Sequence, residues 1–176
     1  MSVDLTSLIV DVPDFPRPGV TFFDITPLLA SAAGFAATVD QLVAAAPPAD
    51  LVLGIESRGF LFAAPVAYRL GLGVVPVRKP GRLPRPVVSV DYESEYRTDT
   101  VSVHADAVAA GSRVLVVDDV LATGGTVAAT ADLVTKLGAT VCGVVVLAEL
   151  AFLEPRARLA AHGLTEVTSL LTLEAP

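Results

Sequence analysis

The sequence contains very little cysteine and histidine. Its single cysteine, Cys142, can form no internal disulfide, which is typical of proteins in a reducing compartment. Because Cys142 lies in an apolar, strand-like run, we predict a buried, inert thiol rather than a nucleophile. The two histidines, His104 and His162, lack the spacing of metal ligands. We therefore predict a cytoplasmic protein with no metal site made of protein side chains.

Basic residues are also scarce. There are 12 Lys and Arg residues against 19 Asp and Glu residues, which gives a net charge of −7 at pH 7. Nonspecific nucleic-acid binding needs a basic face, so this balance argues against it. No apolar run approaches the length of a membrane span, and residues 1–10 lack the basic start of a secretory signal. We predict neither a nucleic-acid partner nor a membrane partner.

Apolar residues are abundant, at 53% of the chain, while aromatic residues make up only 6%. A chain of 176 residues with a core of Ala, Val and Leu predicts one layered α/β domain over 1–176. Hydrophobic periodicity predicts buried strands at 51–55, 73–77, 114–117, 140–147 and 165–173. It predicts helices at 3–10, 31–46 and 60–70, one beginning near Thr126, and one at 152–162.

The most informative stretch is Val114–Thr126, VLVVDDVLATGGT. An apolar strand leads into Asp118-Asp119 and then into a loop that ends Thr123-Gly124-Gly125-Thr126. Backbone N–H groups in such a loop, at the start of a helix, suit a phosphate. The two carboxylates would repel that phosphate unless they bind hydroxyl groups, as they would on a vicinal diol. Together these features describe a ribose 5-phosphate, although the glycines alone would also fit an ordinary strand–helix crossover.

This stretch resembles the signature for 5-phosphoribosyl 1-pyrophosphate (PRPP) in the type I phosphoribosyltransferases. In that family the two acids hold the ribose hydroxyls and the loop holds the 5-phosphate. The resemblance implies catalytic and PRPP-binding roles for Asp118 and Asp119. It also implies that the loop residues bind PRPP: Ala122, Thr123, Gly124, Gly125 and Thr126.

Two further segments carry cations that suit a diphosphate. Glu56-Ser57-Arg58-Gly59 follows a predicted strand, at the sheet edge where open α/β proteins bind ligands. Arg78–Pro86 places four cations among three prolines, which would form an electrostatic clamp. Each could instead be a solvated surface loop. Both resemble diphosphate-binding segments of the family, which implies that Arg58 and Lys79 contact the PRPP diphosphate.

Residues 87–104 alternate apolar and polar positions around a charged centre, which predicts two strands joined by an excursion. Such a lid would exclude water from a reactive sugar cation. The segment resembles the family's flexible loop, at about 79–103. This implies that Glu95 transfers a proton at the base and that Tyr96 covers the diphosphate, although Glu95 could also be a solvated hairpin tip. Arg97 stands where Gly is usual, and Ser102 where a second acid is usual.

The N-terminal stretch resembles the hood of the adenine phosphoribosyltransferases, mainly over 11–30. The resemblance implies that Phe22 stacks on adenine, that Leu150 covers its other face, and that Thr21 and Phe23 bind its edge through their backbone. From composition alone, both rings could fill the edge of the core, and Leu150 could be an ordinary core residue. Phe23 stands where Arg is usual in the family.

The resemblance implies a type I phosphoribosyltransferase fold, a Rossmann-like parallel sheet flanked by helices with a small hood and a flexible lid. It implies a purine-salvage homodimer that converts adenine and PRPP to AMP and pyrophosphate, with Mg²⁺ carried on the PRPP. The absence of Lys from 140–150 favours adenine over a 6-oxopurine. The alternatives are a PRPP-binding regulator without turnover and a transferase for another purine base.

Overall fold

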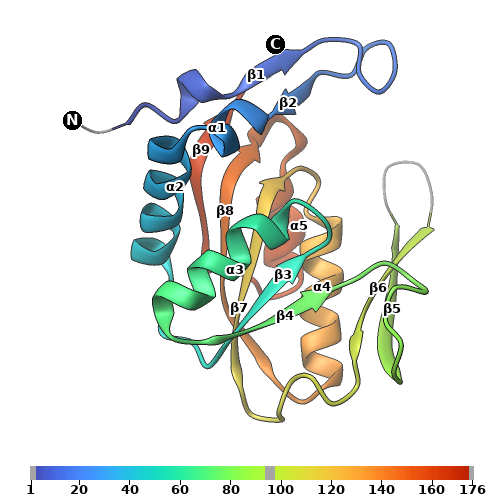
Figure 1. The fold of residues 1–176 in the computed structure, drawn as a ribbon. Coiled ribbons are helices and arrows are strands. Elements are labelled where there is room, and N and C mark those ends of the chain that lie inside the picture. The colour runs from blue at the N-terminus through green and yellow to red at the C-terminus, as the bar shows by residue number, and fades with distance from the viewer. Residues whose placement is uncertain (1–2, 94–97, 175–176) are drawn as a thin grey trace.

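The computed structural model describes residues 3–93 and 98–174. Its centre is a five-stranded sheet in the order β4-β3-β7-β8-β9, in which all neighbouring strands are parallel (Figure 1). The strands are β3 (Leu51–Ile55), β4 (Gly73–Val77), β7 (Arg113–Leu121), β8 (Thr140–Leu150) and β9 (Val167–Leu173). The predicted parallel sheet is confirmed. β7 and β8 extend further than predicted, so the two acids lie within β7.

Helices cover both faces of the sheet, which explains why its strands are apolar runs. On one face lie α2 (Ala32–Ala45) and α3 (Gly59–Leu70). On the other lie α4 (Gly125–Lys136) and the short α5 (Pro155–Ala161). Alternate residues of β7 enter the two cores: Val114 and Val116 pack on the α4 side, while Leu115 and Val117 pack on the α3 side.

The N-terminal segment forms the hood, which lies across the carboxyl ends of β7 and β8 (Figure 1). It comprises a 3₁₀ turn at Thr6–Leu8, β1 (Val10–Val12), β2 (Phe22–Asp24) and α1 (Thr26–Ala30). The helix predicted at 3–10 is wrong, because only one 3₁₀ turn forms and the chain then extends. Val10 and Val12 pair with β2 in an antiparallel ladder, so long-range pairing overrides the local periodicity.

The predicted pair of strands within 87–104 is confirmed as an antiparallel hairpin of β5 (Val87–Glu93) and β6 (Thr98–His104). The hairpin packs on α4, and Ser102 pairs through its backbone with Arg78 at the end of β4. The Ser102 hydroxyl is buried and lies 2.8 Å from Ser89 Oγ, so serine replaces the usual acid without burying a charge. Glu95, Tyr96 and Arg97 lie outside the described residues.

Cys142 is only partly buried, contrary to the prediction, because the first residues of β8 lie at the rim of the sheet. Its thiol still contacts Val114 O at 3.3 Å, and its partial burial raises the pKa of the Cys142 thiol. A thiol with a raised pKa is a poor nucleophile. Among the helices described, none is long and apolar enough to cross a membrane.

Candidate active site

Three cavities lie along the carboxyl edge of the sheet, and neighbouring cavities share lining residues. A cavity of about 450 Å³, the base cavity, lies between the hood and the segment after β8. A cavity of about 70 Å³, the loop cavity, lies over residues 118–127. A cavity of about 260 Å³, the cation cavity, lies between the ends of β3 and β4 and the hairpin. Val120 and Ala122 line the first two cavities and Thr126 lines the last two, so the three form a row.

The loop cavity is formed where β7 turns into α4. Gly124 caps α4 in the left-handed region at φ +77°, and Thr123, Gly125 and Thr126 complete the wall. Glycine adopts this conformation without strain, and the first backbone N–H groups of α4 have no partners within the helix. Together with the helix dipole they make this cavity suitable for a phosphate.

The two acids of β7 are buried, with Asp118 8% and Asp119 6% exposed. Asp118 lines the loop cavity and Asp119 lines the base cavity. Asp118 Oδ1 accepts a hydrogen bond from Asp119 N at 2.9 Å. Burial raises the pKa of the Asp118 carboxyl well above its ordinary value, and the charge of Asp119 adds to this effect. The acid pair therefore lies where the two cavities meet. The raised pKa of Asp118 indicates that neighbouring positive groups do not fully offset the negative charge of the pair.

Asp119 Oδ2 is a buried oxygen whose contact with a neighbouring cation is an ion pair. Arg58 Nε lies 2.6 Å away as an ion pair, but Oδ2 accepts no hydrogen bond from any residue that the structure describes. A buried carboxylate oxygen without a hydrogen bond carries a desolvation cost that a hydroxyl donor would relieve. This oxygen is therefore suited to accept a hydrogen bond from a ligand in the base cavity.

Arg58 lies beside the base cavity. Its guanidinium carbon is 4.9 Å from the centre of the Phe22 ring, in addition to its ion pair with Asp119. Lys79, by contrast, lines the cation cavity. The structure thus separates the two cations predicted to hold the diphosphate, and the shared role of Arg58 and Lys79 stays a prediction.

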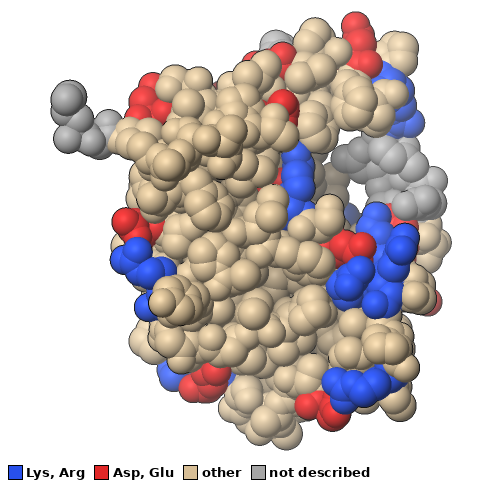
Figure 2. Space-filling model, in the orientation of Figure 1, with Lys and Arg blue, Asp and Glu red and all other residues tan. Residues whose placement is uncertain are grey.

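The cation cavity is organised by Glu56. Glu56 Oε2 accepts hydrogen bonds from Arg78 Nε at 3.0 Å and from Lys79 N at 2.8 Å. Although burial opposes ionisation, these two bonds hold the pKa of Glu56 below its ordinary value. Figure 2 shows basic side chains gathered on this side of the molecule, where β4 leads toward the hairpin. Glu56 thus stays ionised and holds the end of β4 at the cavity.

Both neighbouring phenylalanines of β2 line the base cavity, but their side chains are buried to different extents. Successive side chains of a strand point to opposite faces, so the Phe22 side chain is partly exposed, whereas the Phe23 side chain is 7% exposed and packs in the core. The Phe15 ring supports Phe22 edge-on, with ring centres 5.3 Å apart. Thr21 and Leu150 also line the cavity, so the four residues predicted for adenine come together there.

Comparison with known proteins decides the family. The phosphoribosyl transferase domain family model matches residues 21–162. The adenine phosphoribosyltransferase of Cutibacterium acnes is 57% identical over 170 residues, which cover 96% of each chain. The structure of the Thermoanaerobacter pseudethanolicus adenine phosphoribosyltransferase matches with a TM-score of 0.92 and 47% identity, covering 96% of this chain and 98% of that one. The chain belongs to the adenine phosphoribosyltransferases. The predicted family, fold and enzyme class are confirmed.

A third relative in this family was solved with bound ligands. The Saccharomyces cerevisiae adenine phosphoribosyltransferase was solved in complex with adenine and D-2,5-dideoxy-2,5-imino-altritol 1,6-bisphosphate. It matches this chain with a TM-score of 0.87 and 38% identity, covering 95% of this chain and 96% of that one. The adenine phosphoribosyltransferase fold of this chain is therefore shared with a relative that binds a purine base.

Sequence reasoning missed Tyr92 of β5. Its hydroxyl lies 3.0 Å from Thr126 Oγ1, which joins the hairpin to the phosphate loop, and Tyr92 also lines the cation cavity. The signal was available, because the alternation of β5 places Tyr92 on the same face as Val88 and Val90, toward α4. What the sequence lacked was any indication that this face lies beside Thr126.

Among residues 3–93 and 98–174, no three His, Cys, Asp or Glu side chains lie close enough together to form a metal site. Glu56, beside the cation cavity, is already engaged by Arg78 and Lys79. Mg²⁺ commonly binds through one or two carboxylates together with substrate phosphates.

Proposed function

We propose that this chain transfers the phosphoribosyl group of PRPP to adenine and releases AMP and pyrophosphate, a reaction of purine salvage. The observation that supports this best is the row of three cavities, two of which meet at the buried acid pair, where Asp119 Oδ2 accepts no hydrogen bond from the described residues. A base, a ribose 5-phosphate and a diphosphate are the three parts that such a row would accommodate.

Adenine would occupy the base cavity. The partly exposed ring of Phe22 and the side chain of Leu150 line it, and an aromatic face is suited to stacking on a flat base. Thr21 and Phe23 would bind the edge of the base through backbone groups, which requires nothing of the buried Phe23 side chain. The Phe23 departure from the family's Arg would then have little effect on the base.

The ribose would lie over the acid pair. Asp118 and Asp119 would accept hydrogen bonds from its hydroxyls, which would satisfy Asp119 Oδ2. The 5-phosphate would enter the loop cavity, whose lining residues at 122–126 include the start of α4. Thr123 and Thr126 would add hydroxyl donors to the backbone N–H groups.

The diphosphate would lie toward the cation cavity, where Lys79 contacts it and Arg78 adds positive charge. Arg58 would reach the diphosphate by exchanging its ion pair with Asp119 for one with the ligand. We propose the covering role for Tyr96 from the family resemblance alone. Mg²⁺ bound to PRPP would neutralise part of the diphosphate charge.

The reaction breaks the bond between the anomeric carbon and the pyrophosphate oxygen. The electron pair of that bond leaves with pyrophosphate. A nitrogen of adenine bonds to that carbon and loses its proton, for which Glu95 is the proposed acceptor. Positive charge develops on the ribose, and the carboxylates of Asp118 and Asp119 favour that charge. Holding both reactants in line is the main catalytic contribution, since direct displacement needs no protein nucleophile.

We further propose a homodimer in the cytoplasm. Tyr68 on α3 is 84% exposed, and Leu61 on the same helix and Val74 on the edge strand β4 are also exposed. Exposed apolar side chains on a helix and on a sheet edge favour association. The single cysteine is consistent with a reducing compartment.

A panel of purine bases, each incubated with PRPP and Mg²⁺, tests this function. We expect rapid AMP formation from adenine and little nucleotide from hypoxanthine or guanine. Faster conversion of a 6-oxopurine would overturn the choice of base. Binding of PRPP without formation of any nucleotide would instead support a regulator on the same fold.

A further inference from the structure

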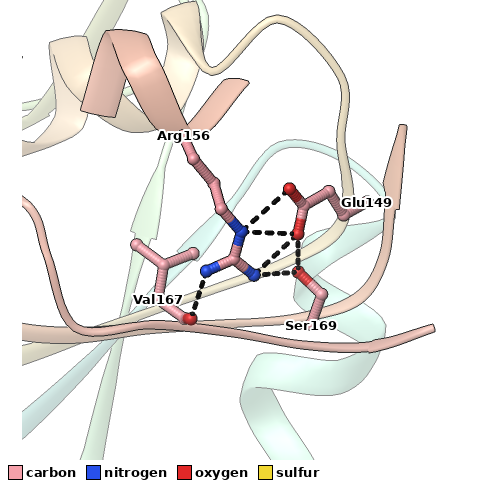
Figure 3. Close-up of polar contacts among 4 residues, drawn as sticks. All are labelled: Glu149, Arg156, Val167 and Ser169. Carbon is pink, nitrogen blue, oxygen red and sulfur yellow. Dashed lines mark hydrogen bonds and ion pairs between the residues drawn. The ribbon is translucent and has the colours of Figure 1, made fainter. Parts of the chain in front are cut away.

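Glu149 and Arg156 form an ion pair, which Figure 3 shows, and they flank the segment that lines the base cavity after β8. Arg156 Nε lies 2.9 Å from Glu149 Oε1 and 3.0 Å from Oε2, and Arg156 Nη2 lies 2.7 Å from Oε2. Glu149, near the end of β8, is buried, while the Arg156 side chain on α5 is half-exposed. Such a two-pronged arrangement fixes the orientation as well as the position of both side chains.

The pair is also tied to β9. Arg156 Nη1 donates to Val167 O at 2.9 Å, and Ser169 Oγ donates to Glu149 Oε2 at 2.8 Å (Figure 3). Arg156 therefore joins three elements, because Glu149 belongs to β8, Val167 and Ser169 belong to β9, and Arg156 itself belongs to α5. These contacts make the end of β8 and the start of α5 one unit.

The segment between the two charged residues forms one wall of the base cavity. Leu150, Phe152 and Leu153 line that cavity, and none of them is charged. Residues Ala151–Leu153 form a single 3₁₀ turn, and Glu154 at φ +50° then connects it to α5. Glu149 and Arg156 flank this segment and line none of the three cavities. The ion pair thus joins the two ends of the segment that forms the wall.

We propose that Glu149 and Arg156 are positioning residues that set adenine affinity by holding the wall formed by Leu150, Phe152 and Leu153 against the base. This inference rests on the proposed adenine site. Leu159, which is fully buried, also packs α5 in the core. Gly124 of the phosphate loop lies close to Pro155 O and Leu159, and we expect the buried Leu159 to keep this loop in place when Arg156 is replaced.

The test compares KM for adenine with KM for PRPP in Arg156→Met, measured as AMP formation with Mg²⁺. We expect KM for adenine to rise about 10-fold, because small misplacements of positioning groups have large kinetic effects. KM for PRPP should stay within about 2-fold of the wild type, since the phosphate loop is not part of the wall. Arg156→Lys keeps the charge and loses the two-pronged geometry. Its KM for adenine should lie between the values of the wild type and of Arg156→Met.

A second variant separates positioning from folding. Arg156→Met leaves the buried Glu149 carboxylate unpaired, so Arg156→Met/Glu149→Gln removes that charge as well. We expect the double variant to regain much of the urea stability that the single variant loses, while KM for adenine stays raised. Arg69→Met is the matched control. It removes the exposed ion pair, 2.7 Å long, between Arg69 on α3 and Asp40 on α2, and neither residue lines any of the three cavities.

Leu150→Ala tests directly whether the wall contacts adenine. If it raises KM for adenine while both Arg156→Met variants keep the wild-type value, the ion pair only supports the fold and the proposal is wrong. Equal rises of KM for adenine and for PRPP in Arg156→Met would also overturn it, because the effect would be general. If Leu150→Ala itself leaves KM for adenine unchanged, the adenine site is wrongly placed, and the wall assignment fails with it.

Discussion

Gly59 lies directly against Asp118. A Cβ added at Gly59 would be 2.6 Å from Asp118 Oδ1 and 3.2 Å from Asp118 Cα. Gly59 is the first residue of α3 and Asp118 lies in β7, so the start of the helix can approach the acid pair only because this residue has no side chain. The missing side chain thus allows the loop at 56–59 to lie beside the acids.

Gly59→Ala should therefore disturb both the fold and the site. The added methyl group must move either the Asp118 carboxylate or the start of α3, because backbone atoms limit the space as well. We expect the free energy of unfolding to fall by about 1–3 kcal/mol. We expect PRPP affinity, measured by isothermal titration calorimetry with Mg²⁺, to fall at least about 10-fold.

Gly73→Ala is the control for that change. A Cβ at Gly73, in β4, would meet only Leu51 Cδ1, at 3.3 Å, and a flexible side-chain end can move aside. We expect little change in urea unfolding and none in PRPP affinity. If Gly59→Ala behaves like Gly73→Ala, the close approach of α3 to Asp118 has no role in PRPP binding.

The buried Asp118 should make the ligand-free protein less stable as the pH rises. Its pKa is raised in the folded state, by burial and by Asp119, so the folded chain holds this proton at a pH where the unfolded chain has lost it. As the pH rises from the ordinary carboxyl value, about 4, through the raised pKa, the folded state loses stability. We expect urea unfolding to show this loss in the wild type.

Asp118→Asn should remove this pH dependence. The amide keeps the shape of the side chain and an oxygen that can accept from Asp119 N, but it carries no charge to bury. At pH 8 we expect the ligand-free variant to be more stable than the wild type by about 1 kcal/mol, or 2–4 °C in Tm. A variant that is less stable than the wild type at pH 8 would show that the Asp118 charge is compensated in the fold.

Tyr92→Phe tests the link between the hairpin and the phosphate loop. The change keeps the ring and removes only the hydroxyl that lies 3.0 Å from Thr126 Oγ1. A hydrogen bond of this kind contributes about 0.5–1.5 kcal/mol, so we expect KM for PRPP to rise about 2–10-fold. Thr135→Val is a control that removes the α4 hydroxyl bonded to Ala131 O. The link is irrelevant to PRPP binding if both variants keep the wild-type KM.

Much of the fold was predictable because its strands are contiguous apolar runs, and the PRPP loop was predictable because its residues are neighbours in sequence. The N-terminal helix was mispredicted because Val10 and Val12 pair with a strand formed later in the chain. Contacts such as Tyr92 with Thr126 depend on packing between distant segments. Helical and strand periodicity indicate which face of an element is buried, but they do not indicate which partner it meets.

The most direct test of the central claim is PRPP binding and AMP formation by the double variant Asp118→Asn/Asp119→Asn. The amides preserve shape while removing the carboxylates that would accept hydrogen bonds from the ribose hydroxyls. Charge-assisted hydrogen bonds contribute about 1.5–3 kcal/mol each, so we predict that PRPP affinity and turnover both fall by about 100-fold or more. Wild-type affinity and turnover in a folded double variant would contradict the assignment of the acid pair to the sugar.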